Sequence, residues 1–413
     1  MALSPIDRRA NAAARGTSGE PLSTPADDSG PIAPLPQSAN DPARRTPLDA
    51  FSLADLEAVR LLLGGGSVID WQRLALRDLA DVDRFLRVNE FRPDDERDLV
   101  RLEQIRDEAV DYLVRNFGFR FPDDVAEGLP VRELFLLASR KSRRQMYACV
   151  VLKAMHVIHH LAGRELLYRL PVSDDEVFRL VERKVVRTVE EIRGAGYPIT
   201  EFQWSRKPRD SLILKLMAKT STLAANIYDK LRFRLIVRDE SDLVPLLREL
   251  SHRLVPFNYV VPGQSVNEIV NLGKLVATMP ALERLQEKLQ TDASAEARAA
   301  TDSAGAANEF SGPGYRVVNF VADVPVRIDE FLGRVADPAV RDFGAIVFVL
   351  TEFQVIDRAT ALANEVGENS HDRYKERQQN RVRMRLMRGQ LLDPPAAPPP
   401  ADTVPGIGRG SDD

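Results

Sequence analysis

Hydrophobic residues recur at intervals of three and four positions along the first half of the chain, from about residue 53 to residue 193. One such run consists of Leu99, Leu102, Ile105 and Val110. This spacing places apolar side chains on one face of an α-helix. The first half is therefore predicted to be helical.

Farther along the chain the pattern changes. Phe233, Leu235 and Val237 alternate with Arg232 and Arg234, which predicts a β-strand with one apolar and one polar face. Similar reasoning predicts strands at 257–261, 315–321 and 346–356, and helices at 211–227, 242–254 and 359–386. The expected fold class is α+β: an N-terminal all-helical domain, then a mixed β-sheet flanked by helices.

Composition divides the chain into four parts. Eight of the 27 prolines lie in residues 1–50 and six more in 391–413, and both segments have few large apolar residues. Such segments cannot bury enough apolar surface to offset chain ordering, so we expect two disordered tails. Between them we expect a helical domain at 51–175 and a second domain at 176–390. The stretch 291–308 has eight alanines and no large apolar residue, so it is predicted to be a low-complexity insertion.

Charge and cysteine content exclude several classes of protein. The formal net charge is -4, so no overall positive field attracts nucleic acid or an anionic membrane. The single cysteine, Cys149, excludes an intramolecular disulfide framework and favours a reducing cytoplasm. The apolar run 345–350 is far shorter than the roughly 20 residues of a membrane helix. A cytoplasmic protein without a membrane partner is expected.

Several polar residues of the second half are candidates for nucleotide chemistry. Lys207, Ser211 and Lys215 are four residues apart, so a helix beginning near Pro208 would align Ser211 and Lys215. Two ammonium groups and the free N–H groups of a helix start would suit a polyphosphate.

Two strands carry further candidates. Asp229 precedes one strand and Arg234 lies within it. Glu352 and Gln354 are two residues apart, which puts them on one face of another strand. Tyr315 follows a glycine at the expected start of a third strand.

These segments, in this order, resemble the RelA/SpoT nucleotidyltransferase family, the alarmone synthetases. The similarity covers residues 177–376, under half of the chain. The matching residues are Lys207/Ser211/Lys215, Asp229/Arg234, Gly314/Tyr315, Glu352/Gln354 and His371/Tyr374/Lys375. The resemblance implies a nucleotidyltransferase-like sheet in residues 176–390 and pyrophosphate transfer from ATP to the 3′-hydroxyl of a guanosine nucleotide.

The resemblance also implies a role for each residue. Asp229 and Glu352 would hold Mg²⁺, with Glu352 as a candidate general base. Arg234 would stack on adenine and Tyr315 on guanine. The remaining nucleotide-binding candidates are Lys207, Ser211, Lys215 and Gln354, of which the two lysines would neutralise the triphosphate.

The chain departs from the family pattern at several positions. Arg232 stands in place of a glycine, Asn319 in place of a histidine, and Ile356-Asp357 in place of an Arg-Thr pair. A catalytically degraded nucleotide-sensing or protein-interaction module therefore stays open as an alternative. No His-Asp hydrolase motif is found in residues 51–195, so hydrolysis of the alarmone is not expected.

Other partners stay open at this point. The end of a tRNA is an alternative acceptor, and an RNA-binding protein that uses the arginines of 377–388 is a third hypothesis. A homo-oligomer and an unidentified protein partner for the helical domain are also open. His156 and His160 are four residues apart and would share a helical face with His159 beside them, but there is no H-E-x-x-H pattern and no third ligand nearby. We therefore expect these histidines to be core or surface residues rather than metal ligands.

Overall fold

The computed structural model describes residues 48–64, 74–218, 230–277, 314–333, 338–366 and 371–387. The tails predicted at 1–50 and 391–413 fall outside these ranges, apart from a short turn at Leu48–Ala50. The insertion predicted at 291–308 also lies outside them.

Helices fill the described part of the first half, as the periodicity predicts. Their bounds are α1 Leu53–Gly64, α2 Leu79–Val88, α3 Glu96–Phe117, α4 Val131–Ser139, α5 Gln145–Arg169 and α6 Asp174–Gly194. Local sequence sets several of the ends. Asp78 and Asp95 accept hydrogen bonds from backbone N–H groups at the starts of α2 and α3, and Ser173 begins a capping box with Glu176.

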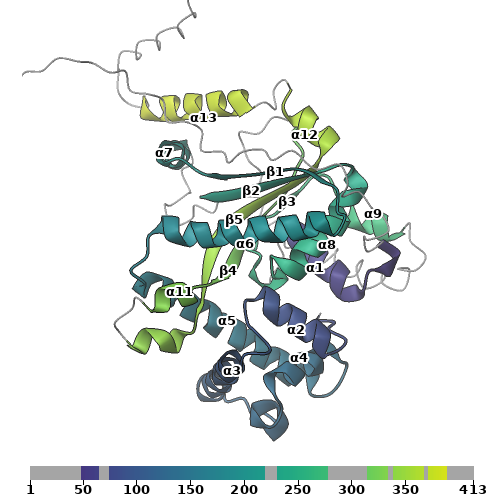
Figure 1. The fold of residues 1–413 in the computed structure, drawn as a ribbon, viewed down its shortest axis with the longest axis vertical. Coiled ribbons are helices and arrows are strands. Elements are labelled where there is room, and N and C mark those ends of the chain that lie inside the picture. Colours follow the sequence, from purple (N-terminus) through teal and green to yellow (C-terminus); the bar gives the residue numbers. More distant parts are fainter. Residues whose placement is uncertain are drawn as a thin grey trace, which may run out of the picture.

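A five-stranded mixed sheet forms the centre of the described second half (Figure 1). Its strands are β1 Ile199–Arg206, β2 Leu231–Val237, β3 Val266–Asn267, β4 Val318–Arg327 and β5 Ile346–Asp357. The order is β1-β2-β5-β4-β3, in which β2 and β5 are parallel and the other neighbours antiparallel. The long strand β5 is therefore central.

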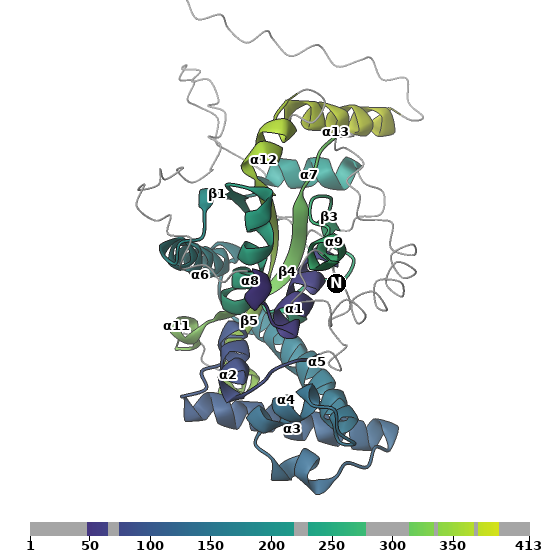
Figure 2. The ribbon, with the colours of Figure 1, turned by 90° about the vertical axis from the view of Figure 1, so that its right-hand side faces the viewer.

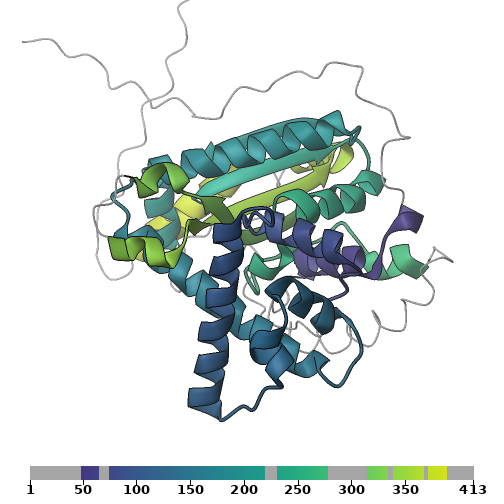
Figure 3. The same ribbon diagram turned by 60° about the horizontal axis from the view of Figure 1, so that its bottom comes forward.

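Helices flank this sheet. They are α7 Arg209–Ala218, α8 Leu243–Arg253, α9 Leu272–Ala277, α11 Asp329–Leu332, α12 Arg358–Asn364 and α13 His371–Leu386. In Figure 3, α6 runs along the strands, while the blue helices α2 to α4 project from one end of the sheet. The predicted α+β fold, with N-terminal helices before a mixed sheet, is confirmed.

Some predicted elements differ from the structure. The strand predicted at 257–261 is wrong: Phe257–Tyr259 is a 3₁₀ turn, and Val260 forms an isolated bridge to Ala322. Pro256 starts that turn with a fixed φ, and the buried Asn258 side chain bonds to Asn89 instead of facing a ladder.

Other boundaries moved. Strand β1 was not predicted, β4 begins at Val318 rather than Tyr315, and the helix predicted at 359–386 is two helices, α12 and α13. The helix predicted at 211–227 begins at Arg209, and its residues after 218 lie outside the described part.

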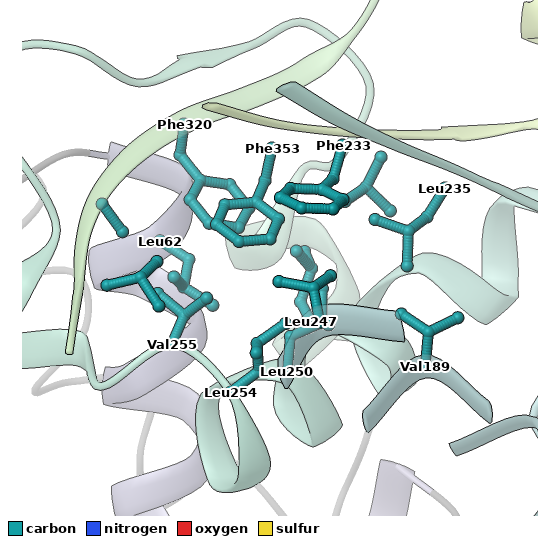
Figure 4. Close-up of a cluster of buried hydrophobic side chains, with 14 of the residues drawn as sticks. Leu62, Val189, Phe233, Leu235, Leu247, Leu250, Leu254, Val255, Phe320 and Phe353 are labelled. Atoms are coloured by element: carbon teal, nitrogen blue, oxygen red, sulfur yellow. The ribbon is translucent and has the colours of Figure 1, made fainter. Parts of the chain in front are cut away.

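Two hydrophobic clusters meet at β5. The larger lies between the sheet and helices α1, α6 and α8, where Phe233, Phe320 and Phe353 are fully buried (Figure 4). The second fills the space among α2 to α5 and includes Ile346 and Phe348 of β5. Within the described ranges, no helix is both long enough and apolar enough to cross a bilayer.

Candidate functional site

The sheet is polar at the centre of one face. Arg232 pairs with Glu352 and Arg234 with Gln354 across β2 and β5, and Asn319 of β4 pairs with Gln354. Because side chains alternate along a strand, these five residues project from the same side of the sheet. We call them the polar face.

The opposite face is apolar. The rings of Phe233 and Phe320 lie 5.7 and 5.3 Å from the ring of Phe353. Figure 4 shows all three rings on the side of Leu247 and Leu250 of α8. Helices α7 and α13 lie on the other side of the sheet from α6 and α8 (Figures 1 and 2), so the polar face is turned toward α7 and α13.

Glu352 is a buried carboxylate on the central strand, 7% exposed. Arg232 Nε donates to its Oε2 at 2.7 Å, and Gln354 Nε2 donates to its Oε1 at 3.4 Å. A buried carboxylate needs such partners, because an uncompensated charge away from water is costly. The ion pair occupies one of the two carboxylate oxygens that could accept a metal or a proton.

Gln354 has one buried polar atom without a partner on each neighbouring strand. Arg234 Nε, a donor, and Asn319 Oδ1, an acceptor, have no hydrogen-bond partner within the described part of the chain. Each unsatisfied buried group costs roughly 1–3 kcal/mol. The sequence named Asn319 only as a departure from the family pattern; the strand register that brings it beside Gln354 is the signal that identifies it.

Tyr315 belongs to the same neighbourhood. Burial raises the pKa of its hydroxyl, and the Arg234 and Arg232 guanidinium groups lower that pKa part of the way back, while Glu352 raises it further. The tyrosine therefore lies within electrostatic reach of three residues of the polar face. It precedes β4 rather than starting it.

Lys207, Ser211 and Lys215 are carried by the end of β1 and by α7. The Lys207 backbone N–H donates to the carbonyl of Lys230, just before β2, at 2.9 Å. Ser211 lies in the first half of α7 and Lys215 one turn later. Helix α7 packs on α13 through Leu214, Ala218, Tyr374 and Val382. Ser211 and Lys215 are thus on a helix that lies on the side of the polar face, and Lys207 lies between the edge strand β1 and that helix.

The proposed metal pair is only half described. Asp229 lies outside the described residues. Glu352 supplies one carboxylate, and magnesium commonly binds one or two carboxylates while water and phosphate oxygens complete its shell. Glu352 fits such an ion once Arg232, whose side chain is 35% exposed, releases Oε2. The described ranges contain no group of three or more His, Cys, Asp and Glu side chains placed to hold a metal.

The three histidines of α5 lie in packed surroundings. His160 Nε2 is 2.7 Å from Asp323 Oδ2 on β4, and His156 Nδ1 is 3.3 Å from Asn258 Nδ2. His159 packs between the rings of Phe91 and Phe348. These contacts join the helical half to the sheet.

Comparison with known proteins gives little overlap in sequence. No family model matches the chain, and no curated protein matches it. Among solved structures, it is similar to small alarmone synthetase 2 from Bacillus subtilis at 16% identity, covering 54% of this chain and 96% of that one, with a TM-score of 0.25. It is also similar to small alarmone synthetase 1 from Bacillus subtilis bound to its product pppGpp, at 16% identity, covering 56% of this chain and 94% of that one, with a TM-score of 0.25. For a second structure of that synthetase the identity is 16%, the coverage is 57% of this chain and 91% of that one, and the TM-score is 0.26. Agreement at this level assigns no activity to this chain.

Proposed function

We propose that the polar face binds nucleotides and that the protein transfers pyrophosphate from ATP to the 3′-hydroxyl of a guanosine nucleotide. The observation that carries the proposal is the pair of buried polar atoms, Arg234 Nε and Asn319 Oδ1, beside Glu352. A ligand that offers both a hydrogen-bond acceptor and a donor would offset their cost. The ordered RelA/SpoT-like motifs supply the identity of that ligand.

In this proposal the general base belongs to the polar face, and the positive charge for the triphosphate comes from α7 and from Lys207 just before it. The 3′-hydroxyl oxygen attacks the β-phosphorus of ATP, a new oxygen–phosphorus bond forms, and the bond to the bridging oxygen of the α-phosphate breaks, so AMP leaves. The hydroxyl proton passes to the Glu352 carboxylate. Lys207, Lys215 and the first turn of α7 at Ser211 neutralise the triphosphate, because positioning and charge neutralisation dominate such transfers.

The bases and the metal complete the arrangement. Tyr315 stacks on guanine, Arg234 stacks on adenine, and Gln354 positions Glu352 through the hydrogen bond between their side chains. Asp229 and Glu352 would hold Mg²⁺, which neutralises phosphate charge when bound.

Incubation with labelled ATP and with GDP, GTP or tRNA as acceptor tests the activity. A labelled product and AMP are expected with a guanosine nucleotide. Glu352→Gln removes the proposed base, so the rate should fall by about 100-fold or more. Glu330→Gln makes the same change in an exposed ion pair with Arg183 and should leave the rate unchanged. Absence of product with every acceptor contradicts catalysis.

A second candidate function is a nucleotide sensor that binds without turnover. The ion pair between Arg232 and Glu352 favours it, because Arg232 replaces the glycine of the family pattern and occupies the proposed base. Calorimetric titration distinguishes the two: a sensor binds a guanosine nucleotide and consumes no ATP. If Arg232 is what blocks turnover, Arg232→Gly should produce it.

RNA binding by α13 stays a third prediction. Arg383 and Arg385 lie in its last turn, and Arg385 Nη1 donates to the carbonyl of Met217. Binding through these arginines would weaken steeply as salt rises.

A further inference from the structure

A row of aromatic rings lies on the helical half, around the end of α3. Figure 1 shows α3 at the far end of the molecule from α13. The row consists of Tyr112, Phe117, Phe119, Phe121 and Tyr147, and we call it the aromatic row. Successive ring centroids are 5.9, 6.5, 5.5 and 6.0 Å apart, and the rings of Phe119 and Phe121 are stacked with an interplanar angle of 11°.

The end of α3 creates this row. Gly118 adopts a left-handed conformation with φ 67°, which ends the helix directly after Phe117. Phe119 and Phe121 follow at alternate positions. Tyr147 arrives from the first turn of α5, so the row joins two segments that are separate in the sequence.

The inner and outer rings of the row have different environments. Phe119, Phe121 and Tyr147 pack against the second hydrophobic cluster, which accounts for them as structural residues. Phe117 is 64% exposed and Tyr112 is 46% exposed. The outer rings thus extend the anchored row into solvent, with most of Phe117 and nearly half of Tyr112 accessible.

The segments that carry the row are rich in basic residues. Residues 112–147 contain seven Lys and Arg against four Asp and Glu. Arg120 lies between two of the phenylalanines, and Arg140, Lys141 and Arg143 are exposed in the loop that leads into α5. Arg144 forms an ion pair with Asp124, which ties this loop to the segment after Phe121. No ion pair within the described ranges involves Arg120, Arg140, Lys141 or Arg143.

We propose that the aromatic row and the adjacent basic loop bind a single-stranded nucleic acid. Bases stack on Phe117 and Tyr112 at the outer end of the row, and the strand runs along the row toward the loop before Tyr147, where Lys141 and Arg143, together with Arg120, neutralise its phosphates. Aromatic faces beside a positively charged track are how proteins hold single strands without reading sequence. A duplex hides its base faces and gains only the charge contacts. This site is independent of the proposed pyrophosphate transfer.

Fluorescence anisotropy of the full chain tests the site, with labelled single-stranded RNA, single-stranded DNA, an abasic strand and a duplex, and without ATP. Phe117→Ala should weaken binding of the base-containing strands by ~5-fold or more, since each stacked base contributes that much. Tyr168→Ala removes an aromatic ring that is 84% exposed elsewhere on α5 and should change nothing. Tighter binding of RNA than of DNA would identify RNA as the ligand, and equal binding a single strand of either kind.

The charge contribution has its own control. Changing Lys141 and Arg143 together to alanine should weaken binding and lower the slope of log affinity against log salt by about two. Lys153→Ala removes an exposed charge farther along α5 and should not.

Three outcomes would overturn the proposal. The first is that no single strand binds at about 50 mM salt. The second is that the abasic strand binds as tightly as the base-containing strand and Phe117→Ala binds as tightly as the parent protein. The third is that Phe117→Ala changes the oligomeric state and nothing else. The last would assign the surface to a second copy of the chain. Because the probe contains no ATP, none of these results bears on pyrophosphate transfer.

Discussion

At the scale of single residues, Asn319 has a cost that folding alone does not explain. Its Oδ1 is buried without a hydrogen-bond partner in the described structure, next to Gln354 and near Arg234. A side chain that lowers stability while lying on a polar face is typical of a binding site, where activity and stability oppose each other.

Asn319→Leu tests this trade-off. Leucine has a similar shape and no unsatisfied oxygen, so the free energy of unfolding should rise by about 1 kcal/mol. Nucleotide affinity should fall by ~5-fold or more, since a hydrogen bond of about 1 kcal/mol is lost. Urea denaturation and calorimetric titration measure the two effects.

Asn267→Leu is the matched control for that variant. The Asn267 Oδ1 accepts hydrogen bonds from the Ile269 and Val270 backbone N–H groups. Its loss should lower stability and leave nucleotide affinity unchanged. Lower stability for Asn319→Leu with intact affinity would assign Asn319 a purely structural role.

His159 makes the stability of the folded protein depend on pH. Burial lowers the pKa of His159 to about 3, and the pKa of His156 to about 3 as well. The unfolded chain therefore takes up protons that the folded chain rejects. Stability is present above the unfolded pKa near 6.5 and is lost as pH falls from there toward 3, by up to ~1.4 kcal/mol per pH unit for each histidine.

His159→Phe should flatten part of this dependence. Both ring nitrogens of His159 lack a hydrogen-bond partner in the described structure, and its ring packs against Phe91 and Phe348. The variant should lose less stability than the parent between pH 6.5 and pH 4.5, measured by urea denaturation. NMR titration of His159 with a midpoint near pH 6.5 would contradict the buried, neutral state.

At the scale of elements, the contact between α5 and β5 depends on Gly163. A Cβ at this position would lie 2.4 Å from Phe348 Cε2 and 2.9 Å from the carbonyl oxygen of Ile346. Alanine in a helix interior is normally about 1 kcal/mol better than glycine. Here Gly163→Ala should instead destabilise the protein by ~1–3 kcal/mol, because helix and strand must separate.

Gly194→Ala is the control for the helix propensity. Gly194 ends α6, and no heavy atom lies within 4 Å of the position of its Cβ. Its midpoint of thermal unfolding should change little. An equal effect of both substitutions would show that the close approach of α5 to β5 is not needed.

Some of these elements could be predicted from the sequence and others could not. The helices of the first half, β2 and α8 follow from periodicity, because each buries mainly one face. Strand β5 follows from a continuous apolar run and is buried along nearly its whole length. Strand β1 was missed because a register shift between Ile199 and Glu201 limits its apolar alternation to Phe202 and Trp204. Period two places Glu352 and Gln354 on one face, but local patterns cannot supply the register that brings Arg232 to Glu352.

At the scale of the whole molecule, the two hydrophobic clusters share α5 and β5. Leu166 of α5 belongs to the larger cluster and Met155 to the second, while on β5 Val347 belongs to the larger and Phe348 to the second. The domain boundary at 175/176 stays a prediction. Leu56, Val59 and Leu62 of α1 are buried in the larger cluster, with the sheet.

We therefore expect one unfolding unit. A fragment of residues 176–390 would lose α1 and α5, and exposing the three α1 side chains alone costs ~1.5–3 kcal/mol each. That sum is comparable to the ~5–15 kcal/mol that holds a typical domain together. The fragment should show no cooperative transition, whereas the full chain should give coincident urea transitions by circular dichroism and by tryptophan fluorescence. A fragment that unfolds cooperatively at the midpoint of the full chain would instead make the helical half a separate, removable domain, because its contacts with the sheet would then contribute almost nothing to stability.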